Sequence, residues 1–133
     1  MTTDVAADLI APVQAYMDAL KAQDIERVLN LFTEDGSLMA NEAPTAVGGE
    51  QLRATFTHFF TMLQLDRDLH VDECFAEGSI GFVRSHTTGS MTIRATKMRM
   101  ELESRELFVL QRSDANWRIR CYMFNAPAAA EKG

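Results

Sequence analysis

Residues 96–112, TKMRMELESRELFVLQR, contain neither proline nor glycine, and side chains of two kinds alternate along them. One alternating set is mainly apolar: Met98, Met100, Leu102, Ser104, Glu106, Phe108 and Leu110. The other set is charged at first and apolar at its end: Lys97, Arg99, Glu101, Glu103, Arg105, Leu107 and Val109. Because successive side chains of a strand point to opposite faces, this period predicts one unusually long strand whose first set faces a core.

The segments around this run extend the pattern in both directions. Period-two alternation predicts further strands at residues 69–75, 80–89 and 117–125, separated by turns at 77–78 and 113–116. Apolar spacing of three and four residues predicts three helices in the first half: 9–20, which starts or kinks at Pro12, then 25–32 after the N-cap Asp24, and 52–63. The stretch between the last two should hold a turn at 34–36, a short strand at 37–40 and a loop at 41–49.

Helices followed by a strand meander predict an α+β domain with the helices on one face of an antiparallel sheet, which wraps around an apolar pocket. The chain of 133 residues has the usual size of one domain, which we place at residues 1–126. The tail 127–133 is predicted to be disordered, because nothing in it can anchor it.

Charge and composition exclude several classes of partner. With a net charge of −6, the surface should repel nucleic acid and anionic membranes. No apolar run approaches the roughly 18 residues of a membrane helix, and the first ten residues lack a basic signal region. The cysteines Cys74 and Cys121 form no CxxC pair, and a reduced, cytoplasmic location is the simplest interpretation.

Glu106 is the residue of greatest chemical interest, because the alternation places its carboxyl on the buried face. Burial disfavours the charged form and raises the pKa, so the group could donate a hydrogen bond or move a proton near neutral pH. Two other interpretations are open. Glu106 could form a structural ion pair with Arg84 or His86, or a one-residue bulge could turn it outward.

Other candidates surround this position. Tyr16 lies on the apolar stripe of the first helix, and His86 is the best proton-transfer candidate of the three histidines, although a plain surface role is also open. Asn125 ends the apolar face of the last strand, where its amide could hold a ligand or could equally satisfy local backbone groups. We add four residues as candidate substrate contacts: Arg84, Met123, Phe60 and Phe108. No metal-ligand, Walker A, GxSxG or GxGxxG motif occurs, so neither a metal nor a cofactor is expected.

Four segments together resemble a known family. They are AYMDALKAQDIERVLNLFTEDGSLMA (15–40) with the following Pro44 and Gly48-Gly49, GFVRSHTTG (81–89), ESRELFVLQR (103–112) and WRIRCYMFN (117–125). The chain is similar, over about residues 5–126, to the SnoaL-like group of the nuclear transport factor 2-like superfamily, which includes ketosteroid isomerase. The resemblance implies a cone: a strongly curved sheet closed by three helices around a deep pocket, commonly in a homodimer through the sheet.

The same resemblance implies roles for individual residues. Tyr16 matches the tyrosine of the ketosteroid isomerase oxyanion hole, and Glu106 falls at or near its acid. The aspartate base of that enzyme corresponds here to Ala40, and the nearest carboxylate, Glu42, lies two residues on. Arg84 and His86 fall where the similar limonene epoxide hydrolases carry an arginine and an acid, whereas their last-strand acid falls near Cys121.

Two functions are therefore open. The chain could be a cofactor-free isomerase, cyclase or dehydratase, related to ketosteroid isomerase or polyketide cyclases, that moves a proton on a small hydrophobic carbonyl compound. Catalytic roles would fall to Glu106, Tyr16 and His86. Alternatively, the pocket holds a hydrophobic ligand unchanged, which the missing base at Ala40 favours. In either case, the apolar residues Leu107, Val109, Tyr122 and Phe124 on the outer sheet face would form a homodimer interface.

Overall fold

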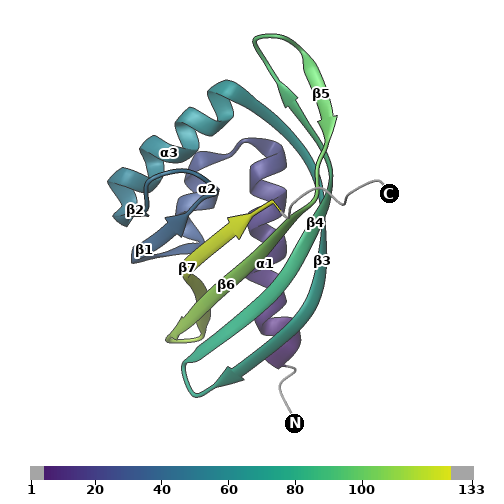
Figure 1. The fold of residues 1–133 in the computed structure, drawn as a ribbon. Helices are drawn as coiled ribbons and strands as arrows, with labels where there is room; N and C mark the ends of the chain where they lie inside the picture. The colour runs from purple at the N-terminus through teal and green to yellow at the C-terminus, as the bar shows by residue number, and fades with distance from the viewer. Residues whose placement is uncertain (1–4, 127–133) are drawn as a thin grey trace.

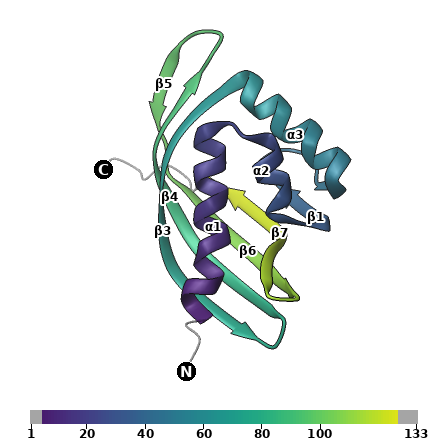
Figure 2. The ribbon, with the colours of Figure 1, turned by 180° about the vertical axis from the view of Figure 1, so that it is seen from behind.

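A strongly curved sheet forms one layer of the molecule, and three helices lie against its concave face (Figures 1 and 2). The computed structural model describes residues 5–126, so the predicted tail lies outside the described residues. The helices are α1 (Val5–Ala22), α2 (Ile25–Asn30) and α3 (Gly48–Met62). The strands are β1 (Phe32–Met39), β2 (Ala46–Val47), β3 (Leu63–Glu77), β4 (Ile80–Ile93), β5 (Met98–Glu101), β6 (Ser104–Ser113) and β7 (Asn116–Asn125).

The sheet is mixed, which corrects the expectation of a purely antiparallel one. Its strand order is β2-β1-β7-β6-β4-β3, and β5 pairs with the far end of β4. Neighbouring strands run antiparallel except β1 and β7, which pair in parallel. The predicted α+β cone with three helices is confirmed, although the sheet is curved without closing on itself.

The first segments follow the helical pattern but not its predicted ends. Helix α1 begins at Val5, so Pro12 lies inside it, and Asp24 caps α2 by accepting a hydrogen bond from the Arg27 amide at 3.2 Å. The expected turn at residues 34–36 is wrong, because these residues lie within β1. The pairing of β1 with β7 is irregular between Phe32 and Ser37, so a turn-prone sequence is accommodated inside a strand.

The long run that decides the fold is two strands and not one. Residues 102–103 separate β5 from β6, and the Leu102 amide donates to the Gly89 carbonyl at 2.9 Å. Glu106, Phe108 and Leu110 are buried as predicted, but Met98 is 56% exposed, because β5 belongs to a hairpin that stands away from the helices (Figure 1). The apolar face therefore reaches the core only along β6.

A bulge in β7 reverses the predicted orientation of its second half. Leu110 pairs with Ile119 and Val109 with Cys121, which leaves Arg120 without a partner in the ladder. An extra residue exchanges the two faces of the strand beyond it. Tyr122 is consequently buried and Phe124 half-buried, while Met123 and Asn125 turn to the outer face, so placing Tyr122 and Phe124 in an outer dimer interface is wrong.

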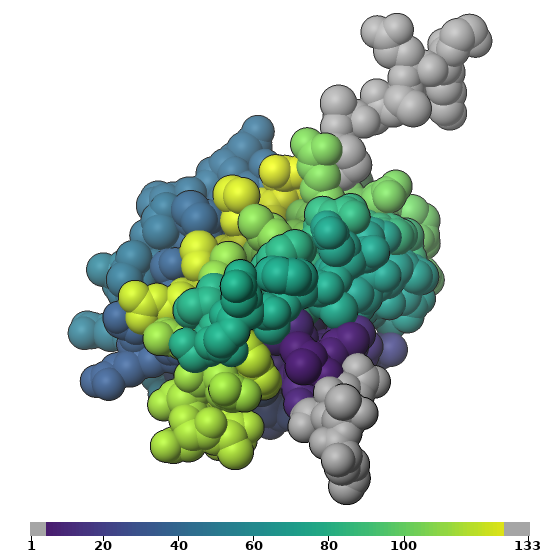
Figure 3. Space-filling view, turned by 90° about the horizontal axis from the view of Figure 1, so that it is seen from below, coloured from purple at the N-terminus to yellow at the C-terminus, as the bar shows by residue number. Residues whose placement is uncertain are grey.

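The core lies between α1, α3 and the concave face of the sheet. Five aromatic rings meet there, and Tyr16 makes edge-to-face contacts with all four others: Phe32, Phe56, Phe108 and Tyr122. The first turns of α1 emerge beside the turns of the β3–β4 and β6–β7 hairpins (Figure 3). None of the helices within residues 5–126 has the length and apolar character required to span a membrane.

Candidate functional site

A cavity of about 320 Å³ opens at the edge of this core, between α1, the end of α3 and the concave face of the sheet. One part of its wall is apolar and includes Met17, Leu20, Phe59, Leu63, Leu65, Met91, Leu102 and Phe124. Its polar side chains are Tyr16, Asn41, Arg67, Thr87, Ser104, Glu106 and Tyr122. An apolar cavity with a few convergent polar groups is the usual form of a small-molecule site.

Glu106 supplies the carboxyl of this cavity, and three hydroxyls surround it. Ser85 Oγ donates to Oε1 at 3.0 Å, while Thr87 Oγ1 and Ser104 Oγ donate to Oε2 at 3.0 and 2.7 Å. The residue is only 4% exposed. Burial raises the pKa of Glu106 above its ordinary value, and the three hydroxyls and the charge of Arg67 oppose that rise. Neither Arg84 nor His86 contacts it, so the alternative of a structural ion pair with one of them is wrong.

Tyr16 and Tyr122 bring two phenol groups to the same part of the cavity. Their ring centroids lie 5.1 Å apart with an angle of 74° between the ring planes, and the Tyr122 hydroxyl donates a hydrogen bond to that of Tyr16. Burial holds the pKa of both phenols well above the ordinary value, and the charge of Glu106 acts in the same direction. Both hydroxyls therefore stay protonated, and because Tyr122 donates its proton to Tyr16, the Tyr16 hydroxyl is the one that can donate to an oxygen of a ligand.

Arg67 is the functional candidate that the sequence reasoning missed. It occupies an inward position of β3 between Leu65 and Leu69, where the alternation calls for an apolar side chain. A charged residue at such a position was the available signal, since a buried charge requires partners. Its Nη2 donates to Thr87 Oγ1 at 2.9 Å and to Ser104 Oγ at 3.0 Å, which links it to Glu106.

The other predicted site residues do not meet at this point. His86 and Arg84 lie on the outer face of β4, where His86 Nδ1 is 2.9 Å from Asp72 Oδ2 and Arg84 Nε is 3.3 Å from Glu73 Oε1. The hydrogen bond with Asp72 raises the pKa of His86. Asp72 reaches this position because a bulge in β3 leaves it unpaired between Val71 and Glu73.

Four predicted substrate contacts also lie away from the cavity. Asn125 accepts a hydrogen bond from Arg105 Nε at 2.6 Å on the outer face, and Met123 beside it is 41% exposed. Both follow the Arg120 bulge. Phe108 is fully buried and stacks on Tyr122 with the ring centroids 4.1 Å apart, so it supports the tyrosine without lining the cavity. Phe60 packs against the core, and the cavity contact falls to Phe59.

Ala40 lines the cavity from the end of β1, where the family resemblance places a catalytic base. The methyl side chain of Ala40 cannot accept a proton. Glu106 is the only carboxylate in the described cavity wall, so any carboxylate base of this cavity must be Glu106. Among residues 5–126, no three histidine, cysteine, aspartate or glutamate side chains cluster closely enough to hold a metal ion.

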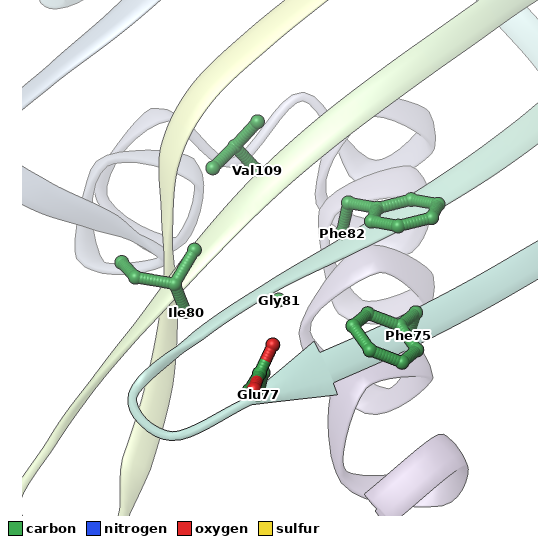
Figure 4. A pocket seen from close by; sticks show the side chains of 6 residues that line it. All are labelled: Phe75, Glu77, Ile80, Gly81, Phe82 and Val109. Carbon is green, nitrogen blue, oxygen red and sulfur yellow. The ribbon is translucent and has the colours of Figure 1, made fainter.

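A second hollow, of about 500 Å³, lies on the outer face of the sheet (Figure 4). The rings of Phe75 and Phe82 lie side by side with centroids 6.2 Å apart, and Ile80 and Val109 both lie to one side of them. Glu77 is the one charged residue in its described wall. With no convergent polar groups, this hollow is a weaker candidate for chemistry than the inner cavity.

Comparison with known proteins gives the family. Residues 13–119 match the model of the SnoaL-like domain. A crystal structure of a ketosteroid isomerase-like protein from Erwinia carotovora atroseptica is 28% identical, with a TM-score of 0.90 over 96% of this chain and 100% of that chain. No protein with curated annotation matches the sequence.

Two more distant structures share the fold. A protein of unknown function from Nostoc punctiforme, described as having a cystatin-like fold, is 16% identical, with a TM-score of 0.76 over 96% of this chain and 95% of that one. A conserved protein from Planctomyces limnophilus is 14% identical, with a TM-score of 0.80 over 92% of this chain and 97% of that one. The match over residues 13–119 decides the assignment: the chain belongs to the family of SnoaL-like domains.

Proposed function

We propose that the inner cavity binds a small hydrophobic carbonyl compound and that the protein moves a proton on it without a cofactor. One observation carries this proposal: the buried carboxyl of Glu106 shares a cavity with the hydroxyls of Tyr16 and Tyr122, while most of the remaining wall is apolar. A carboxyl of raised pKa can exchange a proton with a carbon acid, and a phenol can stabilise the negative oxygen that results.

The family supports this reaction class without naming the substrate. The Erwinia protein is described as ketosteroid isomerase-like. Isomerisation, cyclisation and dehydration of carbonyl compounds can each begin with proton transfer next to the carbonyl. We assign Glu106 the proton transfer and the tyrosine pair the carbonyl oxygen. His86 has no part in this assignment, because it lies on the outer face.

The test compares three variants on a panel of small hydrophobic ketones. Binding is followed by thermal shift and conversion by mass spectrometry. Glu106→Gln and Tyr16→Phe should still bind but lose turnover, whereas the outer-face control His86→Gln should retain it. Full turnover in both cavity variants would overturn the assignment.

A second candidate function is binding without chemistry. Ala40 favours it, since the position that the resemblance gives to a catalytic base carries none. In that case the wild-type protein is stabilised by a bound ketone, and the ligand is recovered unchanged. Recovery of a converted product rules this candidate out.

We also propose a homodimer through the outer face of the sheet. Four apolar side chains remain exposed there in the single chain: Phe75 (56%), Ile80 (47%), Met123 (41%) and Leu107 (37%). Exposed apolar surface of this extent on neighbouring strands is typical of a protein interface.

A further inference from the structure

Arg67 is held in one position by main-chain oxygens. Its Nη1 donates to the carbonyls of Gly89, at 3.1 Å, and Leu102, and its Nη2 donates to the carbonyl of Thr87 at 3.1 Å. These oxygens belong to β4 and to the junction that precedes β6. The guanidinium therefore ties three parts of the sheet together at the polar end of the cavity.

The same guanidinium determines which way two hydroxyls point. Nη2 donates to Thr87 Oγ1 and Ser104 Oγ, and because arginine has donors only, both oxygens must act as acceptors there. Each hydroxyl keeps one proton to donate, and Oε2 of Glu106 lies within 3.0 Å of both. The two hydroxyl oxygens are themselves 2.6 Å apart, so the four groups form one compact network.

The network offers the carboxyl of Glu106 one donor on each oxygen. Ser85 donates to Oε1, and either Thr87 or Ser104 donates to Oε2, because the 2.6 Å contact between these two hydroxyls takes the proton of the other. Hydrogen bonds donated to the charged form of a carboxyl favour that form. The positive guanidinium of Arg67 in the same network also favours the charged form of Glu106, whereas burial disfavours it.

We propose that Arg67 is a positioning residue that keeps Glu106 ionised through Thr87 and Ser104, so that Glu106 is the base of the site. The base role of Glu106 rests on the proposed function, whereas the positioning role of Arg67 does not. Glu106 would then supply what Ala40 does not, and the Tyr16 hydroxyl, itself an acceptor from Tyr122, would remain the donor to the carbonyl oxygen.

The proton-transfer step balances without a further reactant. The C–H bond next to the substrate carbonyl breaks, and the proton goes to a carboxylate oxygen of Glu106. The electron pair forms the carbon–carbon double bond of an enolate and moves the carbonyl π electrons onto oxygen, where Tyr16 donates a hydrogen bond. Return of the proton to a different carbon completes an isomerisation.

Few other charges face this carboxyl. Tyr16 on α1 and Tyr122 on β7 stay neutral, because burial raises the pKa of both. On β4 the nearest ionisable group, His86, lies on the opposite face and is paired with Asp72. Arg67 on β3 is therefore the cation that acts on Glu106 from within the site.

The test is a titration of the Glu106 carboxyl by carbon-13 NMR, with the signal assigned by its loss in Glu106→Gln. Arg67→Met should raise the titration midpoint of Glu106 by about one pH unit, a tenfold lower acid dissociation constant, as expected when an opposite charge is removed. Arg105→Met is the matched control: it removes a charge next in sequence to Glu106 but on the outer face, and should leave the midpoint unchanged.

Ser104→Ala is the second variant, since it removes the shortest donor, at 2.7 Å, from a half-buried position and keeps Arg67. It should raise the midpoint by less than Arg67→Met does, and it remains informative if the arginine variant does not fold. An unchanged or lower midpoint in either folded variant overturns the proposal.

The titration needs no substrate, so the two proposals fail separately. If Arg67→Met leaves the midpoint in place, the positioning role is wrong and the proposed function still stands. If the midpoint moves but no ketone is converted, the base role and the proposed reaction are wrong. With a substrate in hand, turnover should rise with pH as Glu106 ionises, and Arg67→Met should move that rise to higher pH.

Discussion

Replacing Gly89 by alanine should damage both the fold and the site. Gly89 has φ of +126°, a conformation that side chains with a Cβ rarely adopt, and its carbonyl accepts hydrogen bonds from Arg67 and Leu102. A Cβ at this position would lie 2.3 Å from the carbonyl oxygen of Asp66 and 3.2 Å from Cα of Arg67. Both are backbone atoms, so no side-chain rotation relieves the overlap.

The magnitude follows from three contributions. Backbone strain of this kind costs about 1–3 kcal/mol, and forcing an extra carbon into a packed site costs about another 1–3 kcal/mol. The lower entropy of the unfolded chain offsets up to about 1 kcal/mol. We therefore expect Gly89→Ala to lower the free energy of unfolding by about 3 kcal/mol.

Urea unfolding measures this loss. With an m-value of about 2 kcal/mol per molar, the midpoint should fall by roughly 1.5 M. Gly49→Ala is the control: it lies in the first turn of α3, its added Cβ meets nothing within 4 Å, and alanine is the better helix former. A loss below about 1 kcal/mol for Gly89→Ala, or the same change in both variants, would refute the reasoning.

Three further predictions concern charge and assembly. Because burial raises the pKa of Glu106 above 4.5, the folded protein binds this proton more tightly than the unfolded chain, so its stability falls as the pH rises from 4.5 through the folded pKa. Glu106→Gln lacks this pH dependence, so its free energy of unfolding in urea should rise relative to that of wild type over the same pH range. Parallel curves of unfolding free energy against pH for the two proteins would contradict this prediction. Asp72→Asn should lower the pKa of His86 by removing its main hydrogen bond, and an unchanged imidazole NMR midpoint would count against that pairing. Leu107→Asp should convert the proposed dimer to a monomer in sedimentation velocity, and a persistent dimer would exclude this face as the interface.

The sequence predicts best where the alternation runs without interruption. From Glu106 to Leu110 the strand keeps its period and pairs regularly with β4 up to Gln111, so the inward placement of Glu106 could be predicted. Tyr16 was equally accessible, because helical spacing places it on the same side as Val13 and Leu20. Both are set by local periodicity.

The features that escaped prediction depend on contacts distant in sequence. The Arg120 bulge has no sequence signature of its own, so the orientation of Asn125 could not be predicted from the residues before it. Residues 34–36 read as a turn, but pairing with β7 holds them in a strand. Arg67 shows the opposite case: the alternation marks its position, but its partners come from β4 and from the segment around Leu102 and Ser104.

The bulge at Arg120 also has a meaning for the divergence of such proteins. If Arg120 entered the ladder as a paired residue, β7 would keep a single alternation and present Cys121 and Met123 to the ligand in place of Tyr122 and Phe124, whereas deleting Arg120 would leave both rings facing inward. The hydrogen-bonding phenol would give way to a thiol and a thioether while the backbone kept its course. A one-residue change of pairing register, far from any conspicuous motif, can thus alter the chemical selectivity of this scaffold more than most point substitutions.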